Sequence, residues 1–207
     1  MPVLRGLAGL RNRRPFDEMI SDLALKVLAE VAIMTTVHDM TMNAKLFPDD
    51  GQLCTAKILI VDDESADIRV LEWTLRAARF LNVRSVTDST RALKLYHEFQ
   101  PDLVLLDLYM PELDGFAILK QLRATVPEGD FLPVLVLTGY DTAETRNQAM
   151  AAGANDFLGK PINCTEVMLR IRNLLQTRFL HRQAREMQER LETVPAARNS
   201  SPQTKLS

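Results

Sequence analysis

Four short polar stretches, each at the end of an apolar run, carry the side chains in this sequence that could do chemistry. Asp62 and Asp63 follow the first run, Asp107 ends another, and Thr138 and Lys160 follow two later ones. Crowded carboxylates repel one another unless a cation joins them, and Mg²⁺ favours a few hard oxygen ligands together with waters and bound phosphate. The pattern therefore predicts a Mg²⁺ site, with Asp63 and Asp107 as the direct ligands.

Phosphoryl transfer is the chemistry that best suits this set of residues. A carboxylate can attack phosphorus to give an aspartyl phosphate, and Asp107 is the best candidate because other polar stretches flank it. The metal and the ammonium of Lys160 would offset the negative charge of the incoming group. The hydroxyl of Thr138 can donate to one of its oxygens. We therefore expect a phosphoacceptor at Asp107.

These polar stretches meet only if the apolar runs are neighbouring strands of one sheet. The run from Leu103 to Leu106 lacks polar alternation, which favours a strand buried on both faces of a parallel sheet. Expected strands cover residues 58–61, 83–86, 103–106, 133–137 and 155–158, alternating with helices at 65–80, about 92–99, 114–124, 143–152 and from 165 onward. This alternation predicts an α/β fold, a doubly wound five-stranded parallel sheet in the flavodoxin-like order 2-1-3-4-5, with one crevice at the carboxyl ends of its strands.

The same stretches resemble the receiver domain of bacterial two-component response regulators. The matching segments are ILIVDDE ending at Glu64, LVLLDLYMPELDGF around Asp107, PVLVLTG ending at Gly139 and GANDFLGKP ending at Pro161, and the resemblance covers Lys57 to about Leu175. It implies that Asp107 accepts a phosphoryl group from a histidine kinase or phosphotransfer protein. It also implies a switch of protein association that phosphorylates and dephosphorylates itself, rather than an enzyme acting on other molecules.

The resemblance assigns further roles at the metal site. It implies that Asp63, Asp107 and the backbone carbonyl of Tyr109 hold Mg²⁺, with Asp62 acting mainly through water. Tyr109 and Tyr140 are bulky where they border the site, so we expect them to restrict the attacking water and to lengthen the lifetime of the phosphoryl group.

The resemblance also assigns a switch. Thr138 and Lys160 would bind the phosphoryl oxygens, and Phe157 would be the aromatic side chain that reorients when Thr138 moves. A cis peptide bond is implied between Lys160 and Pro161. Gly159 adds a flexible residue next to the lysine.

Composition limits the other classes of partner. Lys and Arg number 25 against 27 Asp and Glu, so the general basicity of a nucleic-acid-binding protein is absent. The sequence contains no convincing membrane span or signal peptide. The two cysteines, Cys54 and Cys164, have no metal-ligand spacing, which favours reduced thiols and a cytoplasmic location.

Segments outside the expected sheet suggest an organisation in four parts. Residues 1–52 predict an amphipathic helical appendage, which either packs on its own domain or contacts a partner. Residues 53–176 form the receiver, 177–194 extend its last helix, and 195–207 have the composition of a disordered tail. Within the extension, Leu180, Ala184, Met187 and Leu191 follow a four-three-four spacing, which fits either a short coiled-coil seam or a monomeric helix. A homodimer through the terminal helices is therefore one expectation.

Two alternative functions stay open. The long last helix resembles those of receivers that precede cyclic-di-GMP phosphodiesterase or diguanylate cyclase domains, so the chain could be the regulatory module of a larger output protein. A haloacid-dehalogenase-like phosphatase also forms an aspartyl phosphate with Mg²⁺. That family carries its nucleophile in a DxD pattern at the first strand, whereas the candidate here, Asp107, ends the third.

Overall fold

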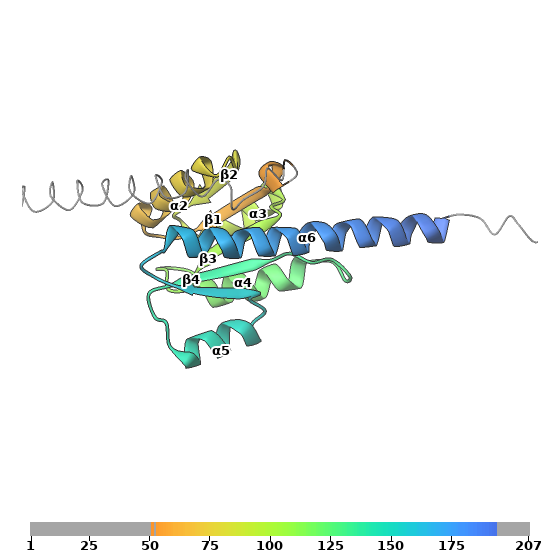
Figure 1. Ribbon diagram of the computed structural model, residues 1–207. Coiled ribbons are helices and arrows are strands. Elements are labelled where there is room, and N and C mark those ends of the chain that lie inside the picture. The colour runs from red at the N-terminus through yellow and green to blue at the C-terminus, as the bar shows by residue number, and fades with distance from the viewer. Residues whose placement is uncertain (1–50, 52, 194–207) are drawn as a thin grey trace, which may run out of the picture. The chain divides into compact units, whose positions relative to one another are not determined.

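A five-stranded parallel sheet with helices on both faces forms the centre of the molecule (Figure 1). The computed structural model describes residue 51 and residues 53–193, so the predicted tail and almost all of the predicted N-terminal appendage lie outside the described residues. The sheet order is β2-β1-β3-β4-β5, which confirms the predicted fold class. The strands are β1 (Lys57–Val61), β2 (Asn82–Val86), β3 (Leu103–Asp107), β4 (Val134–Thr138) and β5 (Asp156–Gly159).

Three helices that follow strands have a polar side chain capping their first turn. Glu64, Asp114 and Thr142 accept hydrogen bonds from backbone amides in the first turns of α2, α4 and α5. The helical elements are η2 (Leu53–Thr55), α2 (Ser65–Ala77), η3 (Ser89–Arg91), α3 (Ala92–Phe99), α4 (Gly115–Thr125), α5 (Ala143–Ala151) and α6 (Cys164–Thr193). The caps hold the amino ends of these three helices beside the carboxyl ends of the strands.

Helix α2 ends earlier than the predicted range of 65–80. Arg79 has a φ of 66°, and the amide of Phe80 donates to the carbonyl of Leu75 at 2.9 Å. This left-handed turn stops the helix and returns the chain toward the sheet, where Phe80 is buried.

Strands β3 and β4 are buried along their whole length, as expected for the middle of a parallel sheet. One face of the sheet packs on α3, α4 and α5, while α2 and α6 lie together over the other face. Asp107 pairs in register with Leu137, and Thr138 pairs with Gly159. The register therefore places the polar ends of β3, β4 and β5 beside one another.

Helix α6 is continuous through the predicted boundary at residues 176 and 177, and its packing continues beyond it. Phe179 is buried, Arg178 contacts Asp130, and Arg182 lies 3.4 Å from Asp102. These contacts join α6 to the loops that precede β3 and β4, at the amino ends of the strands. Farther along, the helix projects away from the sheet (Figure 1). Among the described helices, none combines the length and the low polarity needed to cross a bilayer.

Gly115 gives the sharpest test of this packing. A Cβ at this position would lie 2.1 Å from the carbonyl oxygen of Asp107 and 2.6 Å from the Cα of Leu108. Because backbone atoms must shift to relieve such an overlap, we expect Gly115→Ala to lower the free energy of unfolding by about 3 kcal/mol. Gly139→Ala is the control, since nothing lies within 4 Å of its added Cβ. Equal thermal unfolding midpoints for the two variants would contradict the described approach of α4 to β3.

Candidate functional site

Lys160 joins the acidic side chains at the carboxyl end of the sheet. Its Nζ lies 2.7 Å from Oδ2 of Asp107, and 2.8 Å from Oδ2 of both Asp62 and Asp67. The chain positions this ammonium through the amide of Lys160, which donates to the carbonyl of Thr138 at 2.8 Å. Three of the residues expected at the site, Asp62, Asp107 and Lys160, are therefore in direct contact.

The electrostatics of this contact depend on burial. Burial alone would lower the pKa of the Lys160 ammonium, but its hydrogen bonds to the three carboxylates outweigh burial and raise that pKa above its ordinary value. For Asp62, burial is the largest influence and raises the pKa from 3.8 to about 6, although Lys160 acts in the opposite direction. The lysine therefore stays protonated at neutral pH, whereas the carboxyl of Asp62 loses its proton at a pH of about 6.

Asp107 and Thr138 are both buried, and the backbone that follows each one holds its side chain. The amide of Tyr109 donates to Oδ1 of Asp107 at 3.2 Å, and the amide of Tyr140 donates to the hydroxyl of Thr138, also at 3.2 Å. A hydroxyl that accepts one hydrogen bond still has its own proton to donate.

The acidic residues fit the divalent cation expected from the sequence. Carboxylate oxygens of Asp62, Asp63 and Asp107 lie within 4.8 Å of one another. Oδ2 of Asp62 is buried 2.8 Å from Nζ of Lys160, and it shares that ammonium with Asp67 and Asp107. Asp63 is exposed, so an ion could reach the cluster from solvent. Hard oxygen donors in this number suit Mg²⁺.

Asp67 is a member of the site that the sequence analysis missed. It lies in the first turn of α2, four residues after Asp63, and its side chain reaches back over the strand end to Lys160. The sequence did contain a signal, because an acid in the first turn of a helix that follows Asp62 and Asp63 must lie near the same strand end.

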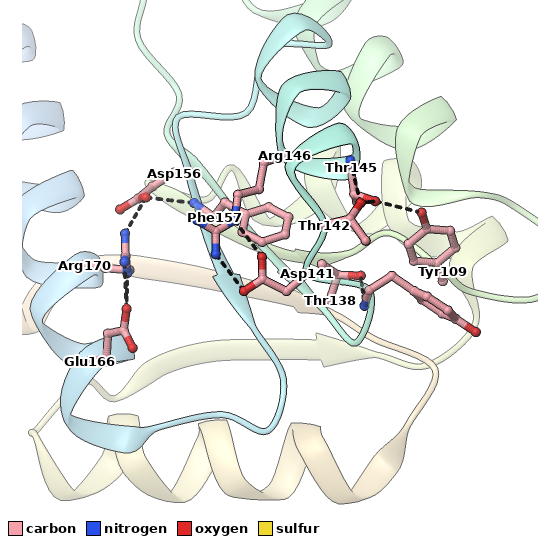
Figure 2. A network of polar contacts seen from close by, with 11 residues as sticks. Tyr109, Thr138, Asp141, Thr142, Thr145, Arg146, Asp156, Phe157, Glu166 and Arg170 are labelled. Atoms are coloured by element: carbon pink, nitrogen blue, oxygen red, sulfur yellow. Dashed lines mark hydrogen bonds and ion pairs between the residues drawn. The ribbon is translucent and has the colours of Figure 1, made fainter.

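The side chains of Phe157, Tyr109 and Tyr140 make their described contacts outside the carboxylate cluster. Phe157 is buried on β5, and its ring lies under the guanidinium of Arg146 (Figure 2). The rings of Tyr109 and Tyr140 have centroids 4.6 Å apart and are 47% and 64% exposed. Figure 2 also shows the hydroxyl of Tyr109 directed toward Thr145, at 3.5 Å. The peptide bond between Lys160 and Pro161 is cis, as expected.

Comparison with known proteins identifies a family that matches the part of the chain that forms the sheet and the carboxylate cluster. The response regulator receiver domain family matches residues 58–172, which is more than half of the chain. Response regulator PleD of Caulobacter vibrioides is 38% identical over 125 residues, covering 60% of this chain and 27% of PleD. Response regulator MprA of Mycobacterium sp. (strain KMS) is 42% identical over 123 residues, covering 58% of this chain and 50% of MprA. The chain therefore spans half or less of the length of these relatives.

Solved structures give the same result. Chemotaxis protein CheY4 of Vibrio cholerae superposes with a TM-score of 0.54 at 28% identity, over 58% of this chain and 98% of that one. A protein described as a two-component system response regulator/GGDEF domain protein superposes with a TM-score of 0.56 at 26% identity, over 61% of this chain and 51% of that one. On the match to its sequence and the agreement of its fold, this chain belongs to the response regulator receiver domain family.

Proposed function

We propose that this chain is a phosphorylation-controlled switch, which accepts a phosphoryl group on Asp107 from a histidine kinase or phosphotransfer protein. The observation that carries the proposal is the contact between Lys160 and the buried Asp107, in a cluster that also contains Asp62 and Asp63. Membership of the receiver family supports it. The chain would act on its own aspartate and catalyse no reaction of other molecules.

The transfer proposed at Asp107 exchanges one bond to phosphorus for another. A carboxylate oxygen of Asp107 forms the new O–P bond while the P–N bond of a phosphohistidine breaks. The imidazole nitrogen keeps the electron pair of that bond and takes up a proton. Lys160, already held against Asp107, would bind one phosphoryl oxygen, and the hydroxyl of Thr138 would donate to another.

Mg²⁺ would be held by Asp63 and Asp107, with the carbonyl of Tyr109 as a further ligand and Asp62 acting mainly through water. When bound, it would supply positive charge against the phosphoryl oxygens. Three carboxylates share the single ammonium of Lys160, and the negative charge that this leaves supports a cation at this place.

The output of the switch would be a change of protein association. Thr138 ends β4 directly before the loop to α5, so its movement toward a phosphoryl group would displace that loop. Phe157 lies on the neighbouring strand β5. The surface formed by α5, β5 and α6 is therefore the part of the molecule that we expect to respond.

A second candidate is that the chain is the regulatory module of a larger output protein. It covers 27% of PleD and 51% of the response regulator/GGDEF domain protein. In such a protein, α6 would form the connection to the output domain. The phosphatase alternative has no comparable support, because the candidate nucleophile ends β3 and the chain belongs to the receiver family.

Phosphorylation is tested by the intact mass of the protein after incubation with acetyl phosphate and Mg²⁺. We expect wild type to gain the mass of one phosphoryl group and Asp107→Asn to gain none. Asp102→Asn is the control, since Asp102 contacts Lys57 and Arg182, away from the cluster, and this variant should behave as wild type. No gain in wild type, or an equal gain in Asp107→Asn, would contradict the proposed phosphoacceptor.

Mg²⁺ affinity should fall in acid because Asp62 becomes protonated. Its pKa is raised to about 6, so the carboxylate is ionised above that pH and increasingly neutral below it. At about pH 5 only about a tenth of Asp62 is ionised, and we expect the Mg²⁺ dissociation constant by calorimetry to be about tenfold higher than at about pH 7.5. Asp62→Asn should show a weaker and flatter profile. Equal Mg²⁺ affinities of wild type at the two pH values would refute this role of Asp62.

The tyrosine pair should lengthen the life of the phosphoryl group by restricting water. We expect the double substitution Tyr109→Ala and Tyr140→Ala to speed hydrolysis on the order of tenfold, because the two rings contact each other two residues beyond Asp107 and Thr138. The decay of the phosphorylated mass after removal of the donor measures this rate. Trp73→Ala, which removes a partly exposed aromatic side chain from α2, is the control. An unchanged rate in the tyrosine variant would exclude the pair as a barrier to water.

Dimerisation through the end of α6 is the proposed association. Leu180, Met187 and Leu191 are 63–70% exposed along one seam of the helix. If two copies pair there, Leu180→Lys with Met187→Lys should sediment as a monomer under conditions where phosphorylated wild type is a dimer. Glu186→Lys changes a charge outside the seam and should retain the dimer. Monomeric wild type in both phosphorylation states would remove this proposal.

A further inference from the structure

Lys160 has three carboxylate partners, which together can use all of its hydrogen-bond donors. Its Nζ lies 2.7 Å from Oδ2 of Asp107, and 2.8 Å from Oδ2 of Asp62 and of Asp67. A protonated lysine carries three N–H groups, so each carboxylate can accept one of them. The ammonium is therefore held from three sides.

Two of these three partners belong to the cluster that suits a divalent cation. Asp62 and Asp107 form it together with Asp63, and their oxygens lie within 4.8 Å of one another. That group does not include Asp67. Lys160 therefore pairs with two carboxylates that a metal would also use and with one that it would not.

The two shared carboxylates have little spare capacity. Oδ1 of Asp62 accepts a hydrogen bond from the amide of Glu64 at 2.9 Å, and Oδ1 of Asp107 accepts one from the amide of Tyr109 at 3.2 Å. Their Oδ2 atoms face the ammonium of Lys160. Because like charges repel, a metal ion bound to these carboxylates would push the ammonium away from them.

Asp67 differs from the other two partners in its position and exposure. It lies in the first turn of α2, where the amino end of the helix favours a negative charge. Its side chain is 30% exposed, against 1% for Asp62 and 7% for Asp107. Asp67 therefore offers the ammonium a carboxylate outside the buried part of the cluster.

We propose that Asp67 is the anchor of Lys160, which keeps the ammonium at the ends of the strands when Mg²⁺ binds to Asp63 and Asp107. Asp67 is a positioning residue, because it acts through Lys160. With this anchor, the site can hold the metal and the ammonium at the same time. The benefit for phosphoryl transfer rests on the proposed function, since an anchored Lys160 stays available to a phosphoryl oxygen on Asp107.

Mg²⁺ binding in the absence of a phosphoryl donor tests the anchor. Isothermal calorimetry of the full chain measures the Mg²⁺ dissociation constant of wild type and of Asp67→Asn at about pH 7.5. Without the anchor, the ammonium should compete more strongly for Asp62 and Asp107. We expect the dissociation constant to rise about threefold to tenfold, as for the loss of one partly exposed ion pair. An unchanged or lower constant in Asp67→Asn would overturn the proposal.

A double-mutant cycle with Lys160 separates the anchor from a direct effect of the charge of Asp67 on the metal. Lys160→Met removes the competing ammonium, so it should bind Mg²⁺ more tightly than wild type. In that background, Asp67→Asn should raise the dissociation constant by about twofold or less, because no ammonium remains to be held. An equal effect of Asp67→Asn in both backgrounds would show that Asp67 acts by its charge alone, and would contradict the anchor.

Two further variants serve as controls. Glu72→Gln removes a negative charge from the same helix, but the described partner of Glu72 is the hydroxyl of Ser85, at 2.7 Å. This variant should keep the Mg²⁺ affinity of wild type. Asp67→Glu keeps the charge on a longer side chain, so it should recover most of the affinity that Asp67→Asn loses.

The position of the ammonium gives a second readout. In a crystal structure of unphosphorylated wild type grown with Mg²⁺, Nζ of Lys160 should remain within about 3 Å of a carboxylate oxygen of Asp67 and lie farther from Asp107 than it does here. An ammonium that has left Asp67 would overturn the anchor. Neither measurement uses a phosphoryl donor. A wild type that binds Mg²⁺ as described but accepts no phosphoryl group would therefore overturn the proposed function and not the anchor.

Discussion

One ammonium group among crowded carboxylates is the constraint on which the rest of this structure depends. Lys160 lies within 2.8 Å of Asp62, Asp67 and Asp107, and Asp63 lies beside them. When all four acids are ionised, the cluster carries a formal excess of three negative charges (one positive against four negative). Burial makes that excess costly, and the pKa of Asp62 rises to about 6 as a result. A divalent cation would reduce this excess before a phosphoryl group adds further negative charge.

The fold holds these charges together by burying the strands that carry them. Asp107 and Thr138 end two fully buried strands, so the apolar packing of β3 and β4 fixes where the polar groups begin. The helix caps turn the chain away directly beyond the strand ends. Gly115 allows α4 to start against the backbone of Asp107. The carboxyl ends of the strands thus provide a rigid base for the charged cluster, and the loop that follows Thr138 starts from the same place.

Much of this arrangement could be predicted from the sequence because parallel strands leave a strong pattern. Apolar runs predicted most of the strands, and the polar residues at their ends predicted that Asp62 and Asp107 would lie beside Lys160. Contacts set by the rotation of a helix or by side-chain direction could not be read in this way. Asp67 reaches Lys160 because α2 begins at Ser65, and Arg146 reaches Phe157 because α5 packs beside β5. Likewise, Arg178 and Phe179 still pack on the domain beyond residue 176. Arg178 does so through Asp130, which lies far from it in the sequence.

The most direct test of the account is to locate the phosphoryl group within the chain. An aspartyl phosphate is an acyl phosphate, so borohydride reduces it to homoserine and marks the residue that carried it. After treatment with acetyl phosphate and Mg²⁺, reduction and peptide mapping should find homoserine at position 107 alone. Homoserine at position 62 or 63, or at no position, would contradict the assignment of Asp107 as the acceptor and of its neighbours as the groups that hold the metal.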